Sequence, residues 1–274
     1  MSLFRSLAVI TILTLASACA TPPAAPPAAP AAHDPQKDLG LLWVKHAAEY
    51  RAIAKQVYRS ATLALPGYVA DRSWSAMPGQ SGAEQLPPAV ILDVDETVVS
   101  NVDFQLTFER PFANHKLDTW SAGYDSLAIP GVREFVEAAR AAGVTVFFLT
   151  NRPCEPIAGS DDPCPQKQTT IDDIREVGIP VDAEFVMLSG ERPGWDREKL
   201  VRRELIGRDY RVIMLIGDDL GDFIPCTRKK VVDPCTAPGT RASRAAAIQQ
   251  YDALWGAGWY ILPNPMHGSW TTVR

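Results

Sequence analysis

The chain has 274 residues, of which 46% are hydrophobic and 22% charged, a composition typical of a folded protein with a sizeable core. Its 27 basic and 32 acidic residues give a net charge of −5 without blocks of like charge. These figures exclude a disordered chain, a collagen-like repeat and a membrane protein of several spans. The basic residues do not form the cluster that binding of a nucleic-acid polymer requires, so we expect no nucleic acid as partner.

The first 18 residues are typical of an export signal. Arg5 is followed by an apolar run from Leu7 to Leu15, which is too short to span a bilayer, and then by small residues before Cys19. This arrangement is similar to a bacterial lipobox, in which Cys19 would carry the lipid; the alternative is a plain secretory signal cleaved near Ala18. We expect an exported protein, in the periplasm or at the cell surface, anchored to the outer membrane as a lipoprotein.

Residues 20–32 contain only alanine, proline and one threonine. Their prolines favour an extended segment of about 3.1 Å per residue. We interpret residues 19–36 as a lipid-attachment cysteine and a tether that holds a domain, residues 37–274, away from a membrane. A merely disordered N-terminus is the alternative for this stretch.

A long amphipathic helix is expected from about Asp38 to Leu65. Apolar side chains recur there at intervals of three and four residues, and Pro66 and Gly67 are expected to end the helix. We assign it no function, because such a stripe is most often core packing.

From residue 88 onward, short apolar runs alternate with helix-like segments. The runs 89–94, 144–150, 183–188 and 211–219 are rich in β-branched residues and typical of buried parallel strands, and the segments 131–143, 167–178 and 196–207 have helical periodicity and end at glycine. This alternation predicts an α/β fold with a doubly wound, Rossmann-like parallel sheet. A ligand site is expected at the carboxyl ends of its strands.

Polar side chains gather at those strand ends. They are Asp93 and Asp95 after the first run, Thr150, Asn151 and Arg152 at the second, Lys199 ahead of the fourth, and Asp218, Asp219 and Asp222 at its end. An isolated pair of aspartates is weak evidence, since acidic residues at strand ends are often turn or cap residues. Four separate polar groups at one sheet edge are hard to explain in that way.

The segments ILDVDET, FFLTNR, a downstream lysine and GDDLGDF resemble the four motifs of the haloacid dehalogenase superfamily phosphatases. More closely, the chain resembles the class C acid phosphatases, the bacterial lipoprotein acid phosphatase and 5′-nucleotidase family. The similarity extends to AEYRAIAKQVYRSA, SNVDF and ILPNPMHGSW, and so covers nearly all of the chain after the tether. It implies hydrolysis of small phosphate monoesters such as nucleotides or aryl phosphates.

The resemblance implies a role for each motif. Asp93 would be the nucleophile that forms an aspartyl-phosphate, and Asp95 would be the general acid and then the general base. Thr150 would donate a hydrogen bond to the transferred phosphoryl group, and Lys199 would neutralise its charge. The alternative for Lys199 is a solvated helix face. We expect a mildly acidic pH optimum, because the first step needs a proton on Asp95.

A phosphate and several carboxylates repel each other unless a cation lies between them, and hard oxygen ligands favour Mg²⁺. By resemblance, Mg²⁺ would be held by Asp93, the backbone carbonyl of Asp95, and Asp218. Asp219 or Asp222 would then orient water at the ion or the downstream lysine.

Substrate contacts are expected from the second motif and from a small cap insertion at about residues 98–129. Asn151 and Arg152 would lie at the edge of the site, where Arg152 contacts substrate or pairs with a nearby acid. By resemblance, Phe104 and His267 occupy the places where aromatic rings enclose a nucleotide base. Histidine stands where tyrosine is expected, so nucleotide preference stays open, and packing is the alternative for both residues.

Four cysteines remain besides Cys19: Cys154, Cys164, Cys226 and Cys235. In an exported chain an even number indicates two disulfides, for which three connectivities are possible. The short separations favour the local pairs Cys154–Cys164 and Cys226–Cys235, and they do not match the spacing of zinc sites.

Two classes of function follow from these observations. The complete motif set favours an enzyme, either a broad acid phosphatase or a 5′-nucleotidase, with a small phosphomonoester as its substrate. The other class is a non-catalytic surface lipoprotein that uses the fold as a binding scaffold, whose sign would be the loss of the nucleophile. The sequence does not indicate an oligomeric state.

Overall fold

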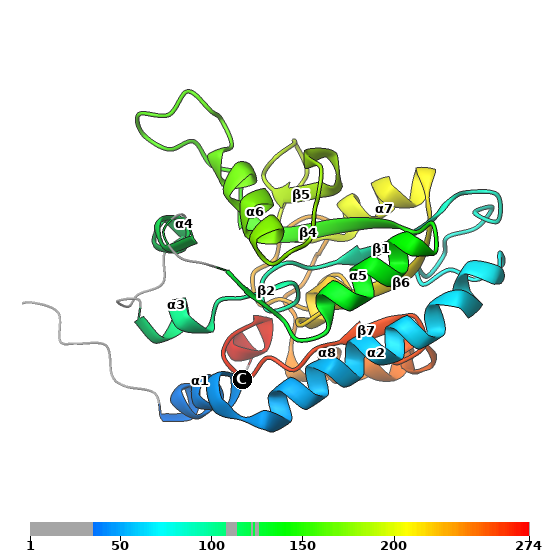
Figure 1. Cartoon of the computed structure of the whole chain (residues 1–274), viewed down its shortest axis with the longest axis horizontal. Coiled ribbons are helices and arrows are strands. Elements are labelled where there is room, and N and C mark those ends of the chain that lie inside the picture. The colour runs from blue at the N-terminus through cyan, green and yellow to red at the C-terminus, as the bar shows by residue number, and fades with distance from the viewer. Residues whose placement is uncertain (1–34, 108–113, 122, 124–125, 274) are drawn as a thin grey trace, which may run out of the picture. The chain divides into compact units, whose positions relative to one another are not determined.

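The computed structural model describes residues 35–107, 114–121, 123 and 126–273. A five-stranded parallel sheet lies at the centre, in the order β5-β4-β1-β6-β7, with helices on both faces (Figure 1). Its strands are β1 (Pro88–Leu92), β4 (Thr145–Pro153), β5 (Val186–Ser189), β6 (Arg211–Gly217) and β7 (Trp259–Ile261). The longer helices are α1 (Pro35–His46), α2 (Ala48–Ala70), α5 (Val132–Ala141), α6 (Pro165–Glu176), α7 (Leu200–Asp209) and α8 (Arg241–Gln250).

The predicted doubly wound α/β sheet is confirmed. The chain starts at the central strand β1, adds β4 and β5 on one side, and then crosses to add β6 and β7 on the other. The strand order therefore reverses beside β1, and such a reversal leaves a crevice at the carboxyl ends of the strands. Both first-motif aspartates follow β1 directly, so the topology places them at that crevice.

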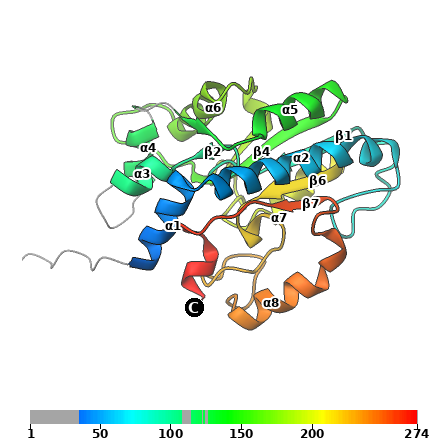
Figure 2. The same cartoon turned by 60° about the horizontal axis from the view of Figure 1, so that its bottom comes forward.

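Alternate residues of the strands point into two separate cores. Val90 and Leu92 of β1 belong to one core, whereas Ala89 and Ile91 belong to the other. Helices α2, α5 and α6 cover the first core, and α7 and α8 cover the second (Figure 2). Because each strand is buried on both faces, its residues read as one apolar run rather than an alternating pattern.

The expected helix over residues 38–65 is wrong in its bounds. The backbone is extended at Ala47, which separates α1 from α2, and Pro66 lies inside α2 instead of ending it. The buried guanidinium of Arg211 donates hydrogen bonds to carbonyls at the end of α2, including that of Tyr68 at 2.9 Å. These hydrogen bonds satisfy carbonyl groups in the last turn of α2. The helix therefore continues past Pro66, although a proline usually ends a helix.

Further element bounds also differ from expectation. β4 extends to Pro153, β6 ends at Gly217, and α7 begins at Leu200, which leaves Lys199 just ahead of the helix. β5 begins at its fourth expected residue, because residues 183–185 form a 3-10 turn. α7 continues past Gly207, whose carbonyl accepts a hydrogen bond from Gln80 Nε2 at 2.8 Å. The short strand β7 was not predicted, since three residues carry too little periodicity to be recognised.

The region at 98–129 leaves the sheet after β1 and returns before α5. Its described part contains β2 (Val99–Ser100), α3 (Val102–Thr107), α4 (Asn114–Ser121) and β3 (Leu127–Ala128), and β2 pairs antiparallel with β3.

The predicted export signal, Cys19 and most of the predicted tether lie outside the described residues. Among the helices that are described, none combines the length and apolar character needed to cross a bilayer.

Candidate active site

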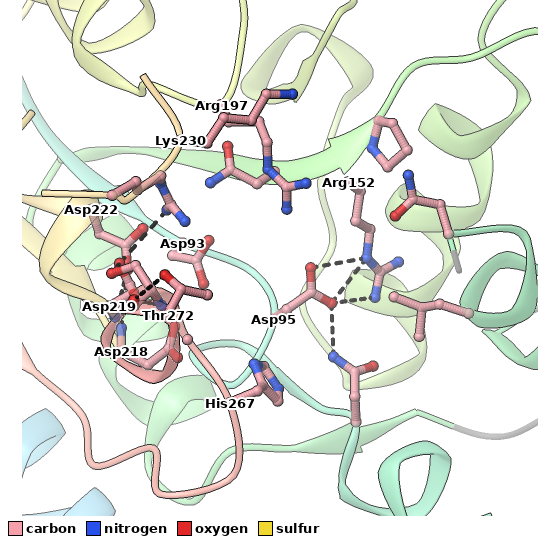
Figure 3. A pocket seen from close by; sticks show the side chains of 18 of the residues that line it. Asp93, Asp95, Arg152, Arg197, Asp218, Asp219, Asp222, Lys230, His267 and Thr272 are labelled. Atoms are coloured by element: carbon pink, nitrogen blue, oxygen red, sulfur yellow. Dashed lines mark hydrogen bonds and ion pairs between the residues drawn. The ribbon is translucent and has the colours of Figure 1, made fainter. Parts of the chain in front are cut away.

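A cavity of about 660 Å³ opens at the carboxyl edge of the sheet (Figure 3). Loops after β1, β4 and β6 form its floor, and α4 and the C-terminal segment contribute to its wall. The sequence-predicted residues that line it are Asp93, Asp95, Asn151, Arg152, Asp218, Asp219, Asp222 and His267. Thr150 and Lys199 are buried and contact members of this set.

Three carboxylates form a compact acidic cluster in the cavity. Asp93, Asp218 and Asp222 each offer an oxygen, and these oxygens lie within 4.8 Å of one another. The grouping follows from the parallel pairing of β1 with β6, whose ends carry the three residues. Asn264 Nδ2 donates a hydrogen bond to Asp218 at 2.6 Å, and Thr97 Oγ1 donates one to Asp93 at 3.1 Å.

Lys199 is the basic residue in contact with this cluster. It directly precedes α7 and is only 2% exposed, which excludes the alternative of a solvated helix face. Its Nζ pairs with Asp93, lies 2.8 Å from Asp222, and donates a hydrogen bond to the carbonyl of Leu149 at 2.6 Å. The ammonium group therefore pairs with two of the three carboxylates, and among the described residues no cation pairs with the Asp218 carboxylate.

Burial and the neighbouring negative charges both raise the pKa values of carboxyl groups in this cluster. Burial raises the pKa of Asp93 to about 7, against the opposing effect of Lys199, and the charge of Asp222 adds to the rise. Burial also raises the pKa of Asp218 well above its ordinary value, and the charges of Asp93 and Asp222 act in the same direction. A divalent cation would offset this repulsion, and carboxylate oxygens are the donors that hard cations prefer. The residues present thus fit a metal ion.

Asp95 lies in different surroundings on the other side of the cavity. Its carboxylate accepts hydrogen bonds from Arg152 Nη2 and Asn101 Nδ2, both at 2.8 Å, and from Thr150 Oγ1 at 3.1 Å. Arg152 also pairs with the buried Asp173 of α6. The structure therefore shows the ion pair that was the alternative for Arg152, and the Thr150 hydroxyl is directed at Asp95.

The charge of Arg152 determines the ionisation of Asp95. Burial alone would raise the pKa of Asp95, but the charge of Arg152 and the hydrogen bonds from Arg152, Asn101 and Thr150 hold it below its ordinary value. Asp95 is accordingly ionised in the free enzyme even at mildly acidic pH. The proton expected for the first step has to reach this carboxyl after substrate has entered.

Comparison with known proteins gives the family. The acid phosphatase family of subfamily IIIB in the HAD superfamily matches residues 30–270. The chain belongs to this family. Two solved structures of a class C acid phosphatase from Bacillus anthracis, one with tungstate bound, are 26% identical in sequence, and each match covers 87% of both chains, with TM-scores of 0.68 and 0.67. The predicted resemblance is confirmed, and the chain is an acid phosphatase of this superfamily.

Two predicted residues of the phosphatase, Asp219 and Asn151, accept hydrogen bonds that stabilise segments lining the cavity. Asp219 accepts hydrogen bonds from Ser269 N at 2.6 Å and from Ser269 Oγ at 2.8 Å, and so fixes the C-terminal segment to the loop after β6. Asn151 Oδ1 accepts a hydrogen bond from the buried Arg202 at 3.1 Å. Both contacts fix backbone segments at the cavity.

The two residues expected to enclose a nucleotide base are placed differently. His267 lines the cavity, with its Nε2 3.5 Å from Oε1 of Glu96. Phe104 is 1% exposed, and its ring packs against Trp120 with the centroids 5.8 Å apart. In the described part of the chain, Phe104 is therefore a packing residue and is not on the cavity wall.

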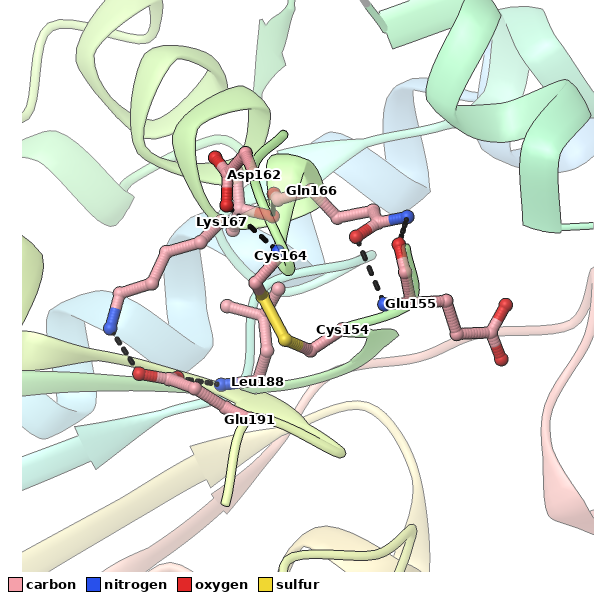
Figure 4. Close-up of a disulfide and its surroundings, with 9 residues drawn as sticks. Cys154, Glu155, Asp162, Cys164, Gln166, Lys167, Leu188 and Glu191 are labelled. Atoms are coloured by element: carbon pink, nitrogen blue, oxygen red, sulfur yellow. Dashed lines mark hydrogen bonds and ion pairs between the residues drawn. A yellow bond between two sulfur atoms is a disulfide. The ribbon is translucent and has the colours of Figure 1, made fainter. Parts of the chain in front are cut away.

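Both predicted disulfides are confirmed. Cys154–Cys164 connects the segment after β4 to the start of α6 (Figure 4), and Cys226–Cys235 closes a loop beyond the 3-10 turn that carries Asp222. Next to the first disulfide, the Gln166 side chain donates a hydrogen bond to the Glu155 carbonyl at 2.9 Å. Each disulfide thus lies close to a segment that lines the phosphatase cavity.

Sequence reasoning missed some of the residues that hold the site. Asn101 and Asn264 fix Asp95 and Asp218, and they lie in SNVDF and ILPNPMHGSW, two segments that were noted only for their similarity. Asp173, the second partner of Arg152, has no signal in the sequence, because an aspartate in a helix looks like an exposed residue.

Proposed function

We propose that this acid phosphatase hydrolyses small phosphate monoesters through an aspartyl-phosphate on Asp93 and needs Mg²⁺. One observation carries the proposal: Asp93 belongs to an acidic cluster that is suited to a cation, and it shares the cavity with the separately held carboxylate of Asp95. The tungstate in the Bacillus anthracis structure supports it, because tungstate is an oxyanion that resembles phosphate.

In the first step, an oxygen of Asp93 attacks the phosphorus of the substrate, and the bond from phosphorus to the leaving oxygen breaks. Lys199 and Thr97 hold the Asp93 carboxylate in position through contacts to its two oxygens. Because the Lys199 ammonium is already fixed by Asp222 and the Leu149 carbonyl, its charge needs no rearrangement to act on the reacting group.

Asp95 handles the protons in both steps. Because Asp95 is ionised in the free enzyme, it first takes a proton from the substrate, which enters as the phosphate monoanion at mildly acidic pH. Asp95 gives this proton to the leaving oxygen, so that the product departs as an alcohol or phenol. It then takes a proton from the water that attacks the aspartyl-phosphate, which releases inorganic phosphate and restores Asp93. The contacts from Arg152, Asn101 and Thr150 hold Asp95 at the cavity for these transfers.

The acidic cluster is the proposed metal site. Asp93, Asp218 and the predicted backbone carbonyl of Asp95 would hold the ion, with Asp222 as an additional ligand, and Mg²⁺ fits oxygen donors of this kind. When bound, the ion supplies the positive charge that lets a phosphate approach carboxylates. Asp222 was expected only to orient water or the lysine; its contact with Lys199 supports that role as well.

For substrate preference we propose a broad acid phosphatase rather than a dedicated 5′-nucleotidase. The packing of Phe104 against Trp120 supports this, because one of the two expected partners of a nucleotide base is away from the cavity wall. His267 lies on the cavity wall, where it can contact the leaving group of the substrate.

We also propose an exported phosphatase that is anchored to the outer membrane through Cys19. The two disulfides support export, since they persist in oxidising compartments. Fractionation of cells that produce the chain or its Cys19→Ala variant tests the anchor. Release of the variant alone from the membrane fraction is expected, whereas equal release of both proteins would favour the plain secretory signal.

Turnover of an aryl phosphate and of a panel of nucleoside 5′-monophosphates, with and without Mg²⁺, tests the enzymatic proposal. Metal-dependent turnover that is lost in the Asp93→Asn variant is expected, with the aryl phosphate at least as good as the nucleotides. Absence of turnover by folded, Mg²⁺-saturated protein would contradict the proposal and favour the binding scaffold. A strong preference for nucleotides would instead identify a 5′-nucleotidase.

A further inference from the structure

We propose that the cavity contains a second anion-binding subsite, formed by Arg197, Lys229 and Lys230, that takes an additional phosphate group on the leaving-group part of the substrate. This inference rests on the proposed function, because it assigns a substrate class to the same cavity. Within the broad substrate range, phosphomonoesters with a second phosphate group, such as nucleoside bisphosphates, should bind more tightly than the corresponding monophosphates.

The charges of the cavity separate into paired and unpaired groups. Arg152 is paired with Asp95 and Asp173, and Arg228 lies 3.6 Å from Asp219. Arg197, Lys229 and Lys230 also line the cavity, but they form neither a hydrogen bond nor an ion pair with any residue that the structure describes.

These three cations come from two segments that the fold holds together. Arg197 precedes α7, and the lysines lie on the loop closed by Cys226–Cys235. The neighbour of Arg197, Glu198, is 1% exposed, and its Oε2 accepts a hydrogen bond from Cys226 N at 3.1 Å. This bond ties the two basic segments to each other at the rim of one cavity.

The backbone of the basic loop is fixed by further contacts. Arg244 Nη1 donates a hydrogen bond to the Thr227 carbonyl at 2.8 Å, and Gly239 N donates one to the Arg228 carbonyl at 2.7 Å. At Gly239 a Cβ would lie 2.4 Å from the Thr227 carbonyl oxygen, so this close approach requires glycine. The lysines thus extend from a constrained backbone, which reduces the ordering cost of binding an anion.

The positive charges of Arg197 and Arg228 repel each other at this rim of the cavity. Partial desolvation and the charge of Arg228 lower the pKa of Arg197, and the charge of Glu155 opposes this with a smaller effect. Figure 3 shows Arg197 and Lys230 on the side of the cavity away from His267. An anion bound between them would relieve the repulsion and gain charge-assisted hydrogen bonds.

The reacting phosphate does not account for these cations. It meets Asp93 at the floor, where Lys199 supplies positive charge and the proposed metal ion would supply more. Three further cations at the rim exceed what one phosphate needs, and they match a second phosphate on the same substrate.

The test compares a nucleoside 5′-monophosphate with the corresponding 3′,5′-bisphosphate at about 0.15 M salt, where long-range attraction is screened beyond roughly 8 Å. The variants are Arg197→Gln, the pair Lys229→Gln with Lys230→Gln, and the triple substitution. Arg208→Gln is the matched control, because Arg208 is exposed on α7 and does not line the cavity.

We expect the wild type to have the lower KM for the bisphosphate. The triple variant should raise this KM about tenfold, which corresponds to roughly 1.4 kcal/mol. Its kcat, and its KM for the monophosphate, should change no more than in Arg208→Gln. Equal KM values for both nucleotides in the wild type, or an equal loss for both in the triple variant, would overturn the inference.

Two controls separate this inference from the proposed function. Turnover of 4-nitrophenyl phosphate, which has no second phosphate, reports on the reaction itself in every variant. Calorimetric binding of both nucleotides to the Asp93→Asn variant, with and without the triple substitution, repeats the comparison in the absence of turnover. Tighter binding of the bisphosphate that the triple substitution removes is expected, and equal binding of the two nucleotides would again overturn the inference.

Discussion

The two aspartates of the first motif are two residues apart and lie in opposite electrostatic surroundings. Asp93 belongs to the acidic side of the cavity, defined by Asp93, Asp218, Asp222 and Lys199, where carboxylates outnumber cations. Asp95 belongs to the paired side, defined with Arg152 and Asp173, where a buried guanidinium joins two carboxylates. The pKa of Asp93 is raised, whereas that of Asp95 is lowered.

Because of this difference, Asp93 and Asp95 can serve two separate functions although they belong to one short segment. A surplus of buried carboxylates favours a cation and destabilises the protein without one. An ion pair fixes a side chain in place, and breaking it is costly because a buried charge loses its counter-charge. The acidic side is therefore suited to binding, and the paired side to positioning.

Asp95→Asn should produce the largest effect, because it removes the proposed proton carrier. For an alkyl phosphate we expect kcat to fall by about 10²- to 10⁴-fold, the usual contribution of general acid–base catalysis. The loss should be smaller for 4-nitrophenyl phosphate, whose leaving group departs without a proton. Steady-state kinetics on both substrates gives the comparison. Equal losses for the two leaving groups would contradict the role as an acid.

Arg152→Met breaks the paired side. It leaves Asp173 buried without the guanidinium that neutralises its charge, and we expect the free energy of unfolding to fall by about 3–5 kcal/mol. Chemical denaturation measures this loss. The double variant with Asp173→Leu should recover part of the stability, because it removes the buried charge. A double variant no more stable than Arg152→Met alone would show that the ion pair is not the cause.

Asp218→Asn acts on the acidic side and should have the opposite sign. Without metal, the variant should unfold at a higher temperature than the wild type, since it removes a carboxylate whose charge is disfavoured in the folded state. Mg²⁺ at about 100 times its Kd should stabilise the wild type by about 2.7 kcal/mol, and the variant much less.

Thermal unfolding with and without Mg²⁺ checks this prediction. Asp118→Asn is the matched control, because Asp118 lines the cavity from α4 and lies outside the acidic cluster. An equal Mg²⁺ effect in Asp218→Asn and in the wild type would place the metal elsewhere.

The smallest effect is expected from the disulfides, which lie at the edges of both sides. Replacing Cys154 and Cys164 by serine should slow turnover while the folded content stays intact, because the disulfide fixes the segment after Arg152 to α6. Activity and circular dichroism on the same sample separate the two outcomes. Unchanged kcat in a protein shown to lack the disulfide would contradict a role in positioning the cavity.

The sequence predicted the features that depend on local pattern. The four longer buried strands, the polar residues at their ends and the two short disulfide loops are predicted, because each has a characteristic run or spacing. The helix bounds failed where a distant side chain intervenes, as Arg211 does at the end of α2. Intrinsic propensity is a weak guide in such places.

The missed parts of the site share one property. The pairing of Arg152 with Asp173 and the unpaired state of Arg197 depend on which side chains meet in three dimensions. No spacing rule distinguishes an arginine that neutralises an acid from one that faces an open cavity. Motifs could therefore identify the reacting residues, whereas the charge balance around them needed the structure.

Transfer of the phosphoryl group to Asp93 is the central step of the proposed mechanism. Acid quenching during turnover tests this step directly. The wild type, mixed with 4-nitrophenyl phosphate and Mg²⁺ and stopped within the first turnovers, should carry one phosphoryl group on the peptide that contains Asp93, as seen by mass spectrometry. The Asp93→Asn variant should carry none. A phosphoryl group on another residue, or a burst of released phenol without any phosphorylated peptide, would contradict the proposed mechanism.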